Sequence, residues 1–452
     1  MTLLNELSAE VCQRARMSRD PRFDGRFFVA VKTTGIFCRP ICPAHLPKEE
    51  NVEYFSSQAL AVSAGYRPCL RCRPESAPHS WAGKGAETTF LRALTLIEQG
   101  ELDGSLETLA SRLGISDRYL RQLFQRHLGM PPKQYAQIQQ LMFAKQLLHT
   151  SQISITEVAY ASGFQSTRRF NDAFQKLFRL TPTQVRRERA ALPSRNHLSL
   201  AFRGPFDWAH MLDFYRLRAI EGMELIDEQS YQRHFVLGEG TGGFKASMAQ
   251  SHLDIEFEME RLSDLRHLVA RLRRMFDLDA DLISIEAHLE QLAPGLVRRT
   301  GIRIPGVWNA WEAGVRAVLG QQVSVKAAIG QLNLLVSTLA ASEGSTRYFP
   351  TPEQVQMSDL SFLRMPERRK ETLKRLADYV RLHPMDSPMA WLSLSGIGPW
   401  TVDYAQLRGE SRSHCFLTGD LIVKKALAKF PQLTAESVAP WGSYATFHCW
   451  SH

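Results

Sequence analysis

The stretch G-I-F-C-R-P-I-C (35–42) contains two cysteines, and a second pair follows in R-P-C-L-R-C (67–72). Three residues separate the first pair, two separate the second, and 26 residues lie between the pairs. Two short pairs at this spacing are typical of a tetrahedral metal site, because each pair holds one side of the ion. Since thiolates favour zinc, the spacing predicts one Zn²⁺ with a small fold built around it, the alternative being four unrelated buried thiols. The cysteines are Cys38, Cys42, Cys69 and Cys72.

The length and the uneven charge limit what the protein can be. A chain of 452 residues is too long for one ordinary domain and predicts three or four. No apolar run reaches the roughly 18 residues of a membrane span, and the start M-T-L-L-N-E-L-S lacks the features of a secretory signal. We therefore expect a cytosolic protein without a membrane partner. The formal net charge is +9, and the whole excess lies in residues 1–190, which favours a polyanionic partner, most often nucleic acid.

Changes in composition divide the chain into segments. E-S-A-P-H-S-W-A-G-K-G-A-E (75–87) has the small and turn residues of a linker, and R-R-E-R-A-A-L-P-S-R (186–195) ends a helical pattern with a basic run. Near 281–305 a strand-like pattern gives way to helices. We expect a multidomain α+β protein with a small zinc-bound α+β domain, an all-α domain, an antiparallel α+β module and a helical domain. The expected segments are 1–75, 87–188, 196–281 and 282–452.

Segment 87–188 contains a repeat with an offset of 50 residues. Y-L-R-Q-L-F-Q-R-H-L-G-M-P-P (119–132) aligns with R-F-N-D-A-F-Q-K-L-F-R-L-T-P (169–182), and each copy follows a short helical pattern that ends at Gly114 or Gly163. A short helix, a sharp turn and a second helix form the helix-turn-helix pattern of DNA-binding proteins. The alternative is a helical bundle with a solvated basic face, which the tandem repeat disfavours.

This double helix-turn-helix arrangement resembles the AraC-type DNA-binding domain, whose paired helices enter successive turns of the major groove. The resemblance covers segment 87–188 and implies promoter DNA as a partner and RNA polymerase as the target of an activator. The side chains expected to face DNA lie on the second helix of each copy. They are Arg118, Arg121 and Gln122 in the first copy, and Arg168 and Asn171 in the second.

The residues around the four cysteines resemble the N-terminal domain of the Ada alkylation sensor. The matching stretches are F-D-G-R-F-F-V-A-V-K-T-T-G-I-F-C-R-P-I-C (23–42) and G-Y-R-P-C-L-R-C (65–72), and the likeness covers essentially all of 1–75. In that family one zinc thiolate takes the methyl group of a DNA methylphosphotriester and keeps it. The resemblance implies that Cys38 is this acceptor. Methylation removes one negative charge next to the DNA backbone, so we expect binding to strengthen by roughly 1–4 kcal/mol.

Two stretches of the helical segment contain candidate functional residues. L-S-G-I-G-P-W-T-V-D-Y (394–404) places two glycines between helices, where backbone N–H groups can bind a phosphate. F-L-T-G-D-L-I-V-K-K-A-L (416–427) places Asp420 directly before a helical pattern. Taken singly, the glycines also fit an ordinary tight turn, and Asp420 also fits an N-cap.

Together with P-G-V-W-N-A-W-E-A-G-V-R-A-V-L-G-Q-Q-V-S (305–324), these stretches resemble the helix-hairpin-helix glycosylases, most closely the AlkA type, 3-methyladenine DNA glycosylase II. The resemblance runs from about residue 200 to the C-terminus and implies that Asp420 is the catalytic carboxylate. It also implies a DNA-gripping hairpin whose carbonyls hold a monovalent cation in relatives. Since an alkylated purine is already cationic, the site has to flip the base and hold it on aromatic faces. The hairpin residues are Gly396, Gly398 and Thr401, and the aligned aromatic residues, for which core packing is the alternative, are Phe214, Trp400, Tyr404 and Trp441.

Two positions depart from this glycosylase family. Some members carry a lysine nucleophile two residues after the second glycine and cleave the DNA strand through a Schiff base. Trp400 stands there, so we expect water as the nucleophile and a monofunctional glycosylase. The residue that fills the gap left by the flipped base is leucine in the best-studied AlkA pattern, and Gln322 stands at that position.

The combined expectation is an Ada–AlkA fusion in the bacterial cytosol, associated with the nucleoid. It would sense methylphosphotriesters at Cys38, activate transcription, and remove alkylated purines such as 3-methyladenine from duplex DNA. The alternative is a transcriptional regulator whose C-terminal half binds DNA without catalysis.

Overall fold

The computed structural model forms two compact units, Met1–Gln139 and Gln140–His452, and the division falls inside helix α6 (Pro132–Thr150). Sequence analysis treats the surrounding segment 87–188 as one unit. The structure describes residues 8–20, 23–72, 74, 81–98, 100, 102, 105–186, 196–340, 342–343, 346–384 and 386–451.

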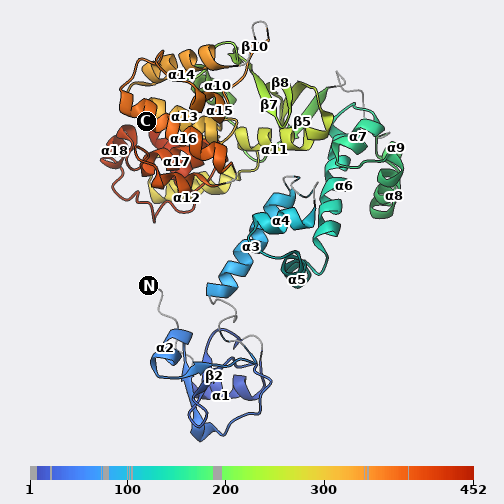
Figure 1. The fold of residues 1–452 in the computed structure, drawn as a ribbon, viewed down its shortest axis with the longest axis vertical. Coiled ribbons are helices and arrows are strands. Elements are labelled where there is room, and N and C mark those ends of the chain that lie inside the picture. Colours follow the sequence, from blue (N-terminus) through green and yellow to red (C-terminus); the bar gives the residue numbers. More distant parts are fainter. Residues whose placement is uncertain are drawn as a thin grey trace. The chain divides into compact units, whose positions relative to one another are not determined.

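The N-terminal part is a small α+β domain, in which Figure 1 labels α1, α2 and β2. Its four-stranded sheet has the order β3-β1-β2-β4. Strands β1 and β2 form an antiparallel hairpin, and β4 pairs with β2 in parallel. Alternate residues of β1 face opposite sides of the sheet: Val29 packs with Cys12 of α1, and Ala30 packs with Ala61 of α2. The elements are α1 (Ala9–Met17), β1 (Phe28–Val31), β2 (Ile36–Cys38), β3 (Val52–Phe55), α2 (Gln58–Ser63) and β4 (Arg67–Pro68).

The repeat predicted from the sequence folds as two successive helix pairs. In the first copy Ser105 and Ser116 cap the two helices, with Gly114 at φ +68° between them. Serine is favoured at this position because its hydroxyl accepts from an unpaired N–H of the first turn. Buried Leu120 and Phe124 anchor the second helix. The helices are α3 (Trp81–Glu98), α4 (Leu106–Arg112) and α5 (Asp117–Leu128).

The second copy repeats these features. Ser154 and Ser166 are the capping residues, Gly163 has φ +84°, and Phe170 and Phe174 occupy the two buried positions. The helices are α7 (Ile155–Ala161), α8 (Thr167–Phe178) and α9 (Pro182–Arg186). The offset of 50 residues is thus confirmed as a repeated three-dimensional unit.

A five-stranded antiparallel sheet of order β5-β9-β8-β7-β6 follows, as expected for an antiparallel α+β module. Helices α10 and α11 contribute Met211, Leu212, Leu268 and Leu272 to the core beneath it. The same hydrophobic cluster includes residues of α7 and α8, and α7 packs against the turn η4 (Leu262–Asp264). The elements are β5 (His197–Ala201), α10 (Trp208–Arg216), β6 (Glu224–Ile226), β7 (Ser230–Leu237), β8 (Gly240–Met248), β9 (His252–Met259) and α11 (Leu265–Met275).

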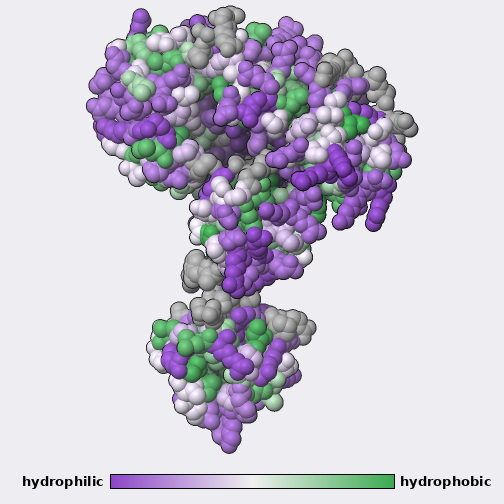
Figure 2. Space-filling view, turned by 45° about the vertical axis from the view of Figure 1, so that its right-hand side comes forward, coloured by the Kyte–Doolittle hydropathy of each residue, from purple (hydrophilic) through white to green (hydrophobic). Residues whose placement is uncertain are grey.

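The C-terminal part is helical, as the sequence predicts, and its centre is α13. Every residue of α13 from Trp311 to Leu319 is buried, which requires neighbours on all sides. Figure 2 shows a mostly hydrophilic surface on the face in view, with small scattered hydrophobic areas. The elements are α12 (Leu282–Leu292), α13 (Ala310–Gly320), α14 (Val325–Leu339), β10 (Ser342–Glu343), β11 (Thr346–Arg347), α15 (Pro352–Met357), α16 (Glu367–Leu382), η5 (Pro388–Ser393), α17 (Pro399–Glu410), α18 (Leu421–Leu427) and α19 (Gly442–Trp450).

A buried carboxyl group connects the end of α11 to α19. Asp277 is 8% exposed and accepts hydrogen bonds from Ile304 N (3.2 Å) and the Tyr444 hydroxyl (2.9 Å). Burial raises the pKa of Asp277 to about 7, although these donors and Arg303 oppose the rise. In the unfolded chain the same group ionises near pH 4.

The first prediction follows from this difference. As pH rises from about 4 to 7, the unfolded chain releases the Asp277 proton before the folded chain does, so ionisation destabilises the fold. Asp277→Asn cannot ionise, and its free energy of unfolding relative to the wild type should rise by on the order of 2 kcal/mol between pH 5 and pH 8. Urea denaturation at the two pH values measures this difference, and an equal value at both would contradict the prediction.

Candidate functional sites

The four predicted zinc ligands lie together at one end of the N-terminal sheet. Pairing of β2 with β4 brings Cys38 next to Cys69, whose N–H donates to the carbonyl of Phe37 (3.0 Å). A turn closed by the N–H of Cys42 on the carbonyl of Arg39 (3.1 Å) returns Cys42 to the cluster. All four sulfur atoms lie within 4.8 Å of one another.

Arg39 supports the cysteine cluster from outside. Its guanidinium forms an ion pair with Asp24 and donates to the carbonyl of Cys72 (3.3 Å), while its backbone N–H lies 3.4 Å from Cys72 Sγ. A hydrogen bond from Cys38 lowers the pKa of Cys72 to about 6, although burial opposes this, and the same hydrogen bond raises the pKa of Cys38. Four converging sulfur atoms with one acidified thiol fit the donor set of a tetrahedral Zn²⁺ site.

Within the cluster Cys38 is partly exposed, while Cys42, Cys69 and Cys72 are buried. Over the whole residue, Cys69 and Cys72 are partly exposed as well, so exposure agrees with Cys38 as the acceptor without deciding it. The assignment of Cys38 as the acceptor therefore rests on the resemblance to the Ada domain.

The side chains expected to face DNA are exposed on α5 and α8. Arg118, Arg121 and Gln122 lie opposite the buried face of α5, and Arg121 pairs with Asp117 at 3.3 Å. On α8, Arg168 and Asn171 are exposed in the same way.

The structure brings Asp420 and three of the four predicted aromatic residues to one cavity of about 410 Å³. Phe214 enters from α10, Trp400 and Tyr404 from α17, and Asp420 from the N-terminus of α18. The two residues of α17 are one helical turn apart, and their rings stack at 5.3 Å between centroids.

Asp420 is both an N-cap and a cavity residue, so the two interpretations left open by the sequence are compatible. Its Oδ1 accepts from Ile422 N (2.8 Å), Val423 N (3.2 Å) and Trp450 Nε1 (3.1 Å). These donors orient the carboxylate from one side, which leaves Oδ2 without a donor among the described residues. Trp450 also lines the cavity, and sequence analysis did not single it out.

Two guanidinium groups cover the Phe214 ring. Arg218 lies 3.7 Å from the ring centroid and Arg408 lies 4.7 Å from it. Trp450 is nearly parallel to the same ring, at 6.3 Å. Phe214 is buried, whereas Trp400 and Tyr404 are partly exposed, although Arg408 also lies 5.7 Å from the Tyr404 ring centroid.

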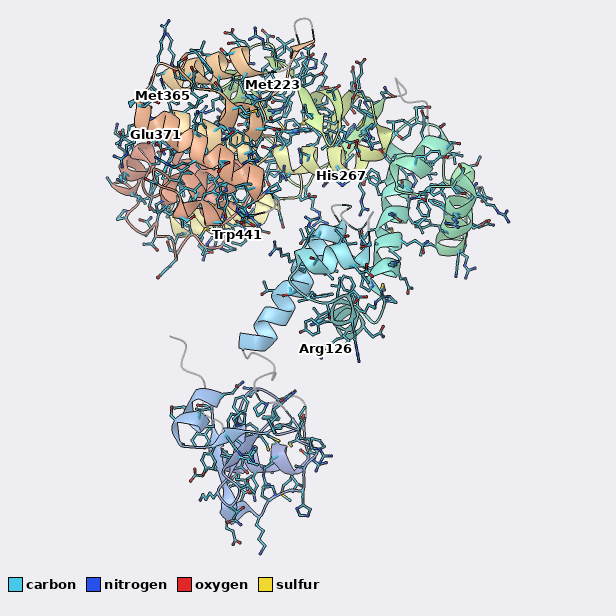
Figure 3. The ribbon with its side chains drawn as sticks, in the orientation of Figure 1. Arg126, Met223, His267, Met365, Glu371 and Trp441 are labelled. Atoms are coloured by element: carbon cyan, nitrogen blue, oxygen red, sulfur yellow. The ribbon has the colours of Figure 1, made fainter. Side chains whose placement is uncertain are left out.

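Trp441, labelled in Figure 3, directly precedes α19. It is not among the described residues that line the cavity, and its ring contacts His288 of α12, 5.0 Å away between centroids. Core packing was the alternative left open for each aromatic residue. The contact of Trp441 with His288 is of this kind.

The hairpin between η5 and α17 depends on a close approach that only glycine permits. Gly396 has φ +93°, and a Cβ atom there would lie 2.1 Å from Thr372 Oγ1. Gly398 is the N-cap of α17, while the Thr401 side chain is buried. Gln321 Nε2 donates to the Gly396 carbonyl and to Thr401 Oγ1, both at 3.2 Å.

Gln322 follows at the exposed tip of the turn between α13 and α14. Its φ of +56° is uncommon for a residue other than glycine. Because Gln321 ties this turn to the hairpin, the backbone around Gln322 is held in place from one side. Sequence analysis did not single out Gln321.

Three family descriptions match the chain. Residues 11–75 match the metal binding domain of Ada, residues 109–188 a helix-turn-helix domain, and residues 197–309 the AlkA N-terminal domain.

Among full-length relatives, the chain is 34% identical over 475 residues to a Mycobacterium tuberculosis (strain CDC 1551 / Oshkosh) protein. That protein is named "Probable bifunctional transcriptional activator/DNA repair enzyme AlkA", and the alignment covers 98% of this chain and 96% of the relative. The chain belongs to this Ada–AlkA family.

Two Escherichia coli (strain K12) proteins resemble separate parts of this Ada–AlkA chain. "DNA-3-methyladenine glycosylase 2" is 33% identical over 277 residues, which is 56% of this chain and 96% of the relative. "Bifunctional transcriptional activator/DNA repair enzyme Ada" is 35% identical over 170 residues, which is 38% of this chain and 47% of the relative. In the part of the chain that the structure describes, no helix is long and apolar enough to cross a membrane.

The cysteine cluster gives the second prediction. Cys69→Ala removes one of four ligands, so metal bound per chain should fall from about one to well below one, because tetrahedral structural sites rarely tolerate three protein ligands. Elemental analysis of the purified protein measures zinc. Cys12→Ala is the matched control, since Cys12 is a buried cysteine in the α1 core outside the cluster. Equal zinc in both variants would contradict the assignment.

Proposed function

We propose that this chain removes alkylated purines such as 3-methyladenine from DNA by hydrolysing the N-glycosidic bond, with Asp420 as the catalytic carboxylate. The observation that carries this proposal is the cavity, in which Asp420 stands beside Trp400 and Tyr404. The similarity of its C-terminal half to a protein named DNA-3-methyladenine glycosylase 2 supports it.

In the proposed reaction the flipped base lies against the partly exposed pair of rings formed by Trp400 and Tyr404. Cation–π attraction contributes about 0.5–2 kcal/mol for such a base. The bond between C1′ and the base nitrogen breaks with its electron pair on the base, which neutralises the base. Oδ2 of Asp420 faces the positive charge that develops on the sugar, and water then bonds to C1′ and loses a proton. Because Trp400 stands where a lysine nucleophile would, the enzyme is monofunctional.

The DNA contacts are assigned to three surfaces. The hairpin residues Gly396 and Gly398, whose fold Thr401 supports, bind the backbone, with a monovalent cation at the hairpin carbonyls, and Gln322 fills the gap left by the flipped base. The exposed side chains of α5 and α8 read promoter DNA, and RNA polymerase is the target of activation. The functional segments are 1–75, 87–188, 196–281 and 282–452.

The N-terminal domain is proposed to sense methylphosphotriesters through Cys38. Zn²⁺ held by the four cysteines would keep their sulfurs deprotonated at neutral pH while leaving them nucleophilic. Cys38 Sγ forms a bond to the methyl carbon, and the carbon–oxygen bond breaks with its electrons on the phosphate oxygen. The result is a thioether and a phosphodiester anion, so the domain loses one negative charge and is repelled less by DNA.

The third prediction tests the carboxylate. Asp420→Asn keeps the N-cap geometry but removes the charge, and release of 3-methyladenine from alkylated duplex DNA should fall roughly 100-fold or more. The measurement is single-turnover release of the free base. Asp403→Asn is the control, because Asp403 lies on α17 but is not among the described residues that line the cavity; it should retain release.

Borohydride trapping on the same substrate tests water as the nucleophile, and no covalent enzyme–DNA adduct should form. If neither the wild type nor Asp403→Asn releases base, the C-terminal half is a DNA-binding module and the protein is a regulator only.

The fourth prediction tests the sensor. After exposure to methylated DNA the wild type should bind its promoter roughly ten- to a thousandfold more tightly, which is the 1–4 kcal/mol of one unit of charge. Cys38→Ser should show no such gain in a binding titration. A gain that persists in Cys38→Ser would overturn Cys38 as the acceptor, and a gain lost equally in Cys12→Ser would point to an unrelated structural effect.

A further inference from the structure

The cavity lining contains a histidine that the proposed excision does not use. His210 lies on α10 one helical turn before Phe214, and both line the same cavity as Asp420. Residues four apart occupy one face of a helix, so this face of α10 presents an imidazole and an aromatic ring. Arg218, which also lines the cavity, follows in the turn after the helix ends at Arg216.

A hydrogen-bond chain at the end of α19 favours one tautomer of the His210 ring. The Ser451 hydroxyl donates to the carbonyl of Phe447 (3.0 Å), so its oxygen is left to accept from His210 Nε2, 3.4 Å away. In a neutral imidazole with Nε2 protonated, Nδ1 carries the lone pair and acts as an acceptor. Ser451 directly follows Trp450, which holds Asp420, so one helix end orients both groups.

The charged groups around His210 lie on α10, directly before and after it, and in the segment before α13. Asp207 and Asp213 favour the protonated ring, whereas Arg299 and Arg218 oppose it. Asp207 is paired with Arg299 at 2.7 Å, and Asp213 is paired with Arg216. Burial is the largest influence and lowers the pKa of His210, so the ring is neutral near pH 7. The α19 residues that face it, Trp450 and Ser451, carry no charge.

We propose that His210 is a specificity-determining residue of this cavity, whose Nδ1 accepts a hydrogen bond from the exocyclic amino group of the flipped base. The proposal rests on the glycosylase function above and selects alkylated aminopurines. A cationic base has more acidic N–H groups and makes a stronger hydrogen bond to a neutral acceptor. Hypoxanthine carries a carbonyl oxygen where adenine carries the amino group, and its lone pairs would face the lone pair of Nδ1.

Protonation of His210 reverses this preference. Below its pKa the ring carries a positive charge and a hydrogen on Nδ1, so it repels a cationic base and donates to a carbonyl. Release of 3-methyladenine should therefore fall as the pH drops below the pKa of His210, whereas release of hypoxanthine should not fall in the same way.

The test compares release of 3-methyladenine and of hypoxanthine from otherwise identical duplexes, under single turnover between pH 5 and pH 8. His210→Phe removes the acceptor and keeps a ring. We expect it to lower 3-methyladenine release roughly tenfold while hypoxanthine release is unchanged or higher. His210→Asn places an amide oxygen near the position of Nδ1. It should restore most of the ratio of 3-methyladenine release to hypoxanthine release, and this ratio should not fall at low pH, because the amide does not titrate. His234→Asn, an exposed histidine on β7 outside the cavity, is the matched control.

Two results would overturn the proposal. One is an equal change in the release of both bases in His210→Phe, with the thermal unfolding of the variant unchanged. The other is a His210→Phe variant in which the ratio of the two release rates is unchanged and 3-methyladenine release still falls at low pH as it does in the wild type. Failure of the wild type to release either base would instead overturn the proposed glycosylase function, and this assignment with it.

Discussion

The C-terminal half depends on one buried cluster of charges between the sheet module and the helical domain. Arg233 of β7 pairs with Glu224 (2.9 Å) and with Glu312 of α13, and Arg316 pairs with both carboxylates. Burial alone would raise the pKa of Glu312, but the two arginines lower this pKa to about 2. Removing a single member would leave an uncompensated buried charge, which costs about 3–5 kcal/mol. The four groups therefore fix the position of α13 against β7.

This cluster also shapes the cavity. Arg316 donates to the carbonyl of Arg218 (2.9 Å), and the Arg218 side chain lies over the ring of Phe214. The cavity wall on α10 is thus attached to the same ionic network that holds α13. Burial lowers the pKa of Arg218 to about 10, which Tyr404 opposes, so the guanidinium remains charged at neutral pH. In the proposed reaction this charge would oppose a cationic base, and the carboxylate of Asp420 and the partly exposed rings of Trp400 and Tyr404 would offset it.

The sequence predicts local features of this protein well and distant pairings poorly. The cysteine spacing, the glycine-ended helix pairs and the position of Asp420 before α18 are each contained in a short stretch, because ligand pairs, turns and caps are set by neighbouring residues. Trp450 and Asp420 are 30 residues apart, and Gln321 and Gly396 are 75 apart, so no local pattern relates them. Trp441 shows the reverse case, since an aligned aromatic residue packs on His288 instead of lining the cavity.

The same reasoning applies to the border between the regulatory and the glycosylase-like parts. A composition break near 186–195 separates two expected segments in the sequence, yet Val158 and Phe174 of the second helix-turn-helix copy belong to one hydrophobic cluster with Leu200 and Leu268 of the sheet module. Apolar area removed from water stabilises by about 25 cal/mol per Å², so separation of the two segments would expose part of a shared core. The second helix pair and the sheet module therefore stabilise each other, although their sequences resemble two different families. A fusion of two DNA-directed functions has in this way become a single folding unit on its C-terminal side.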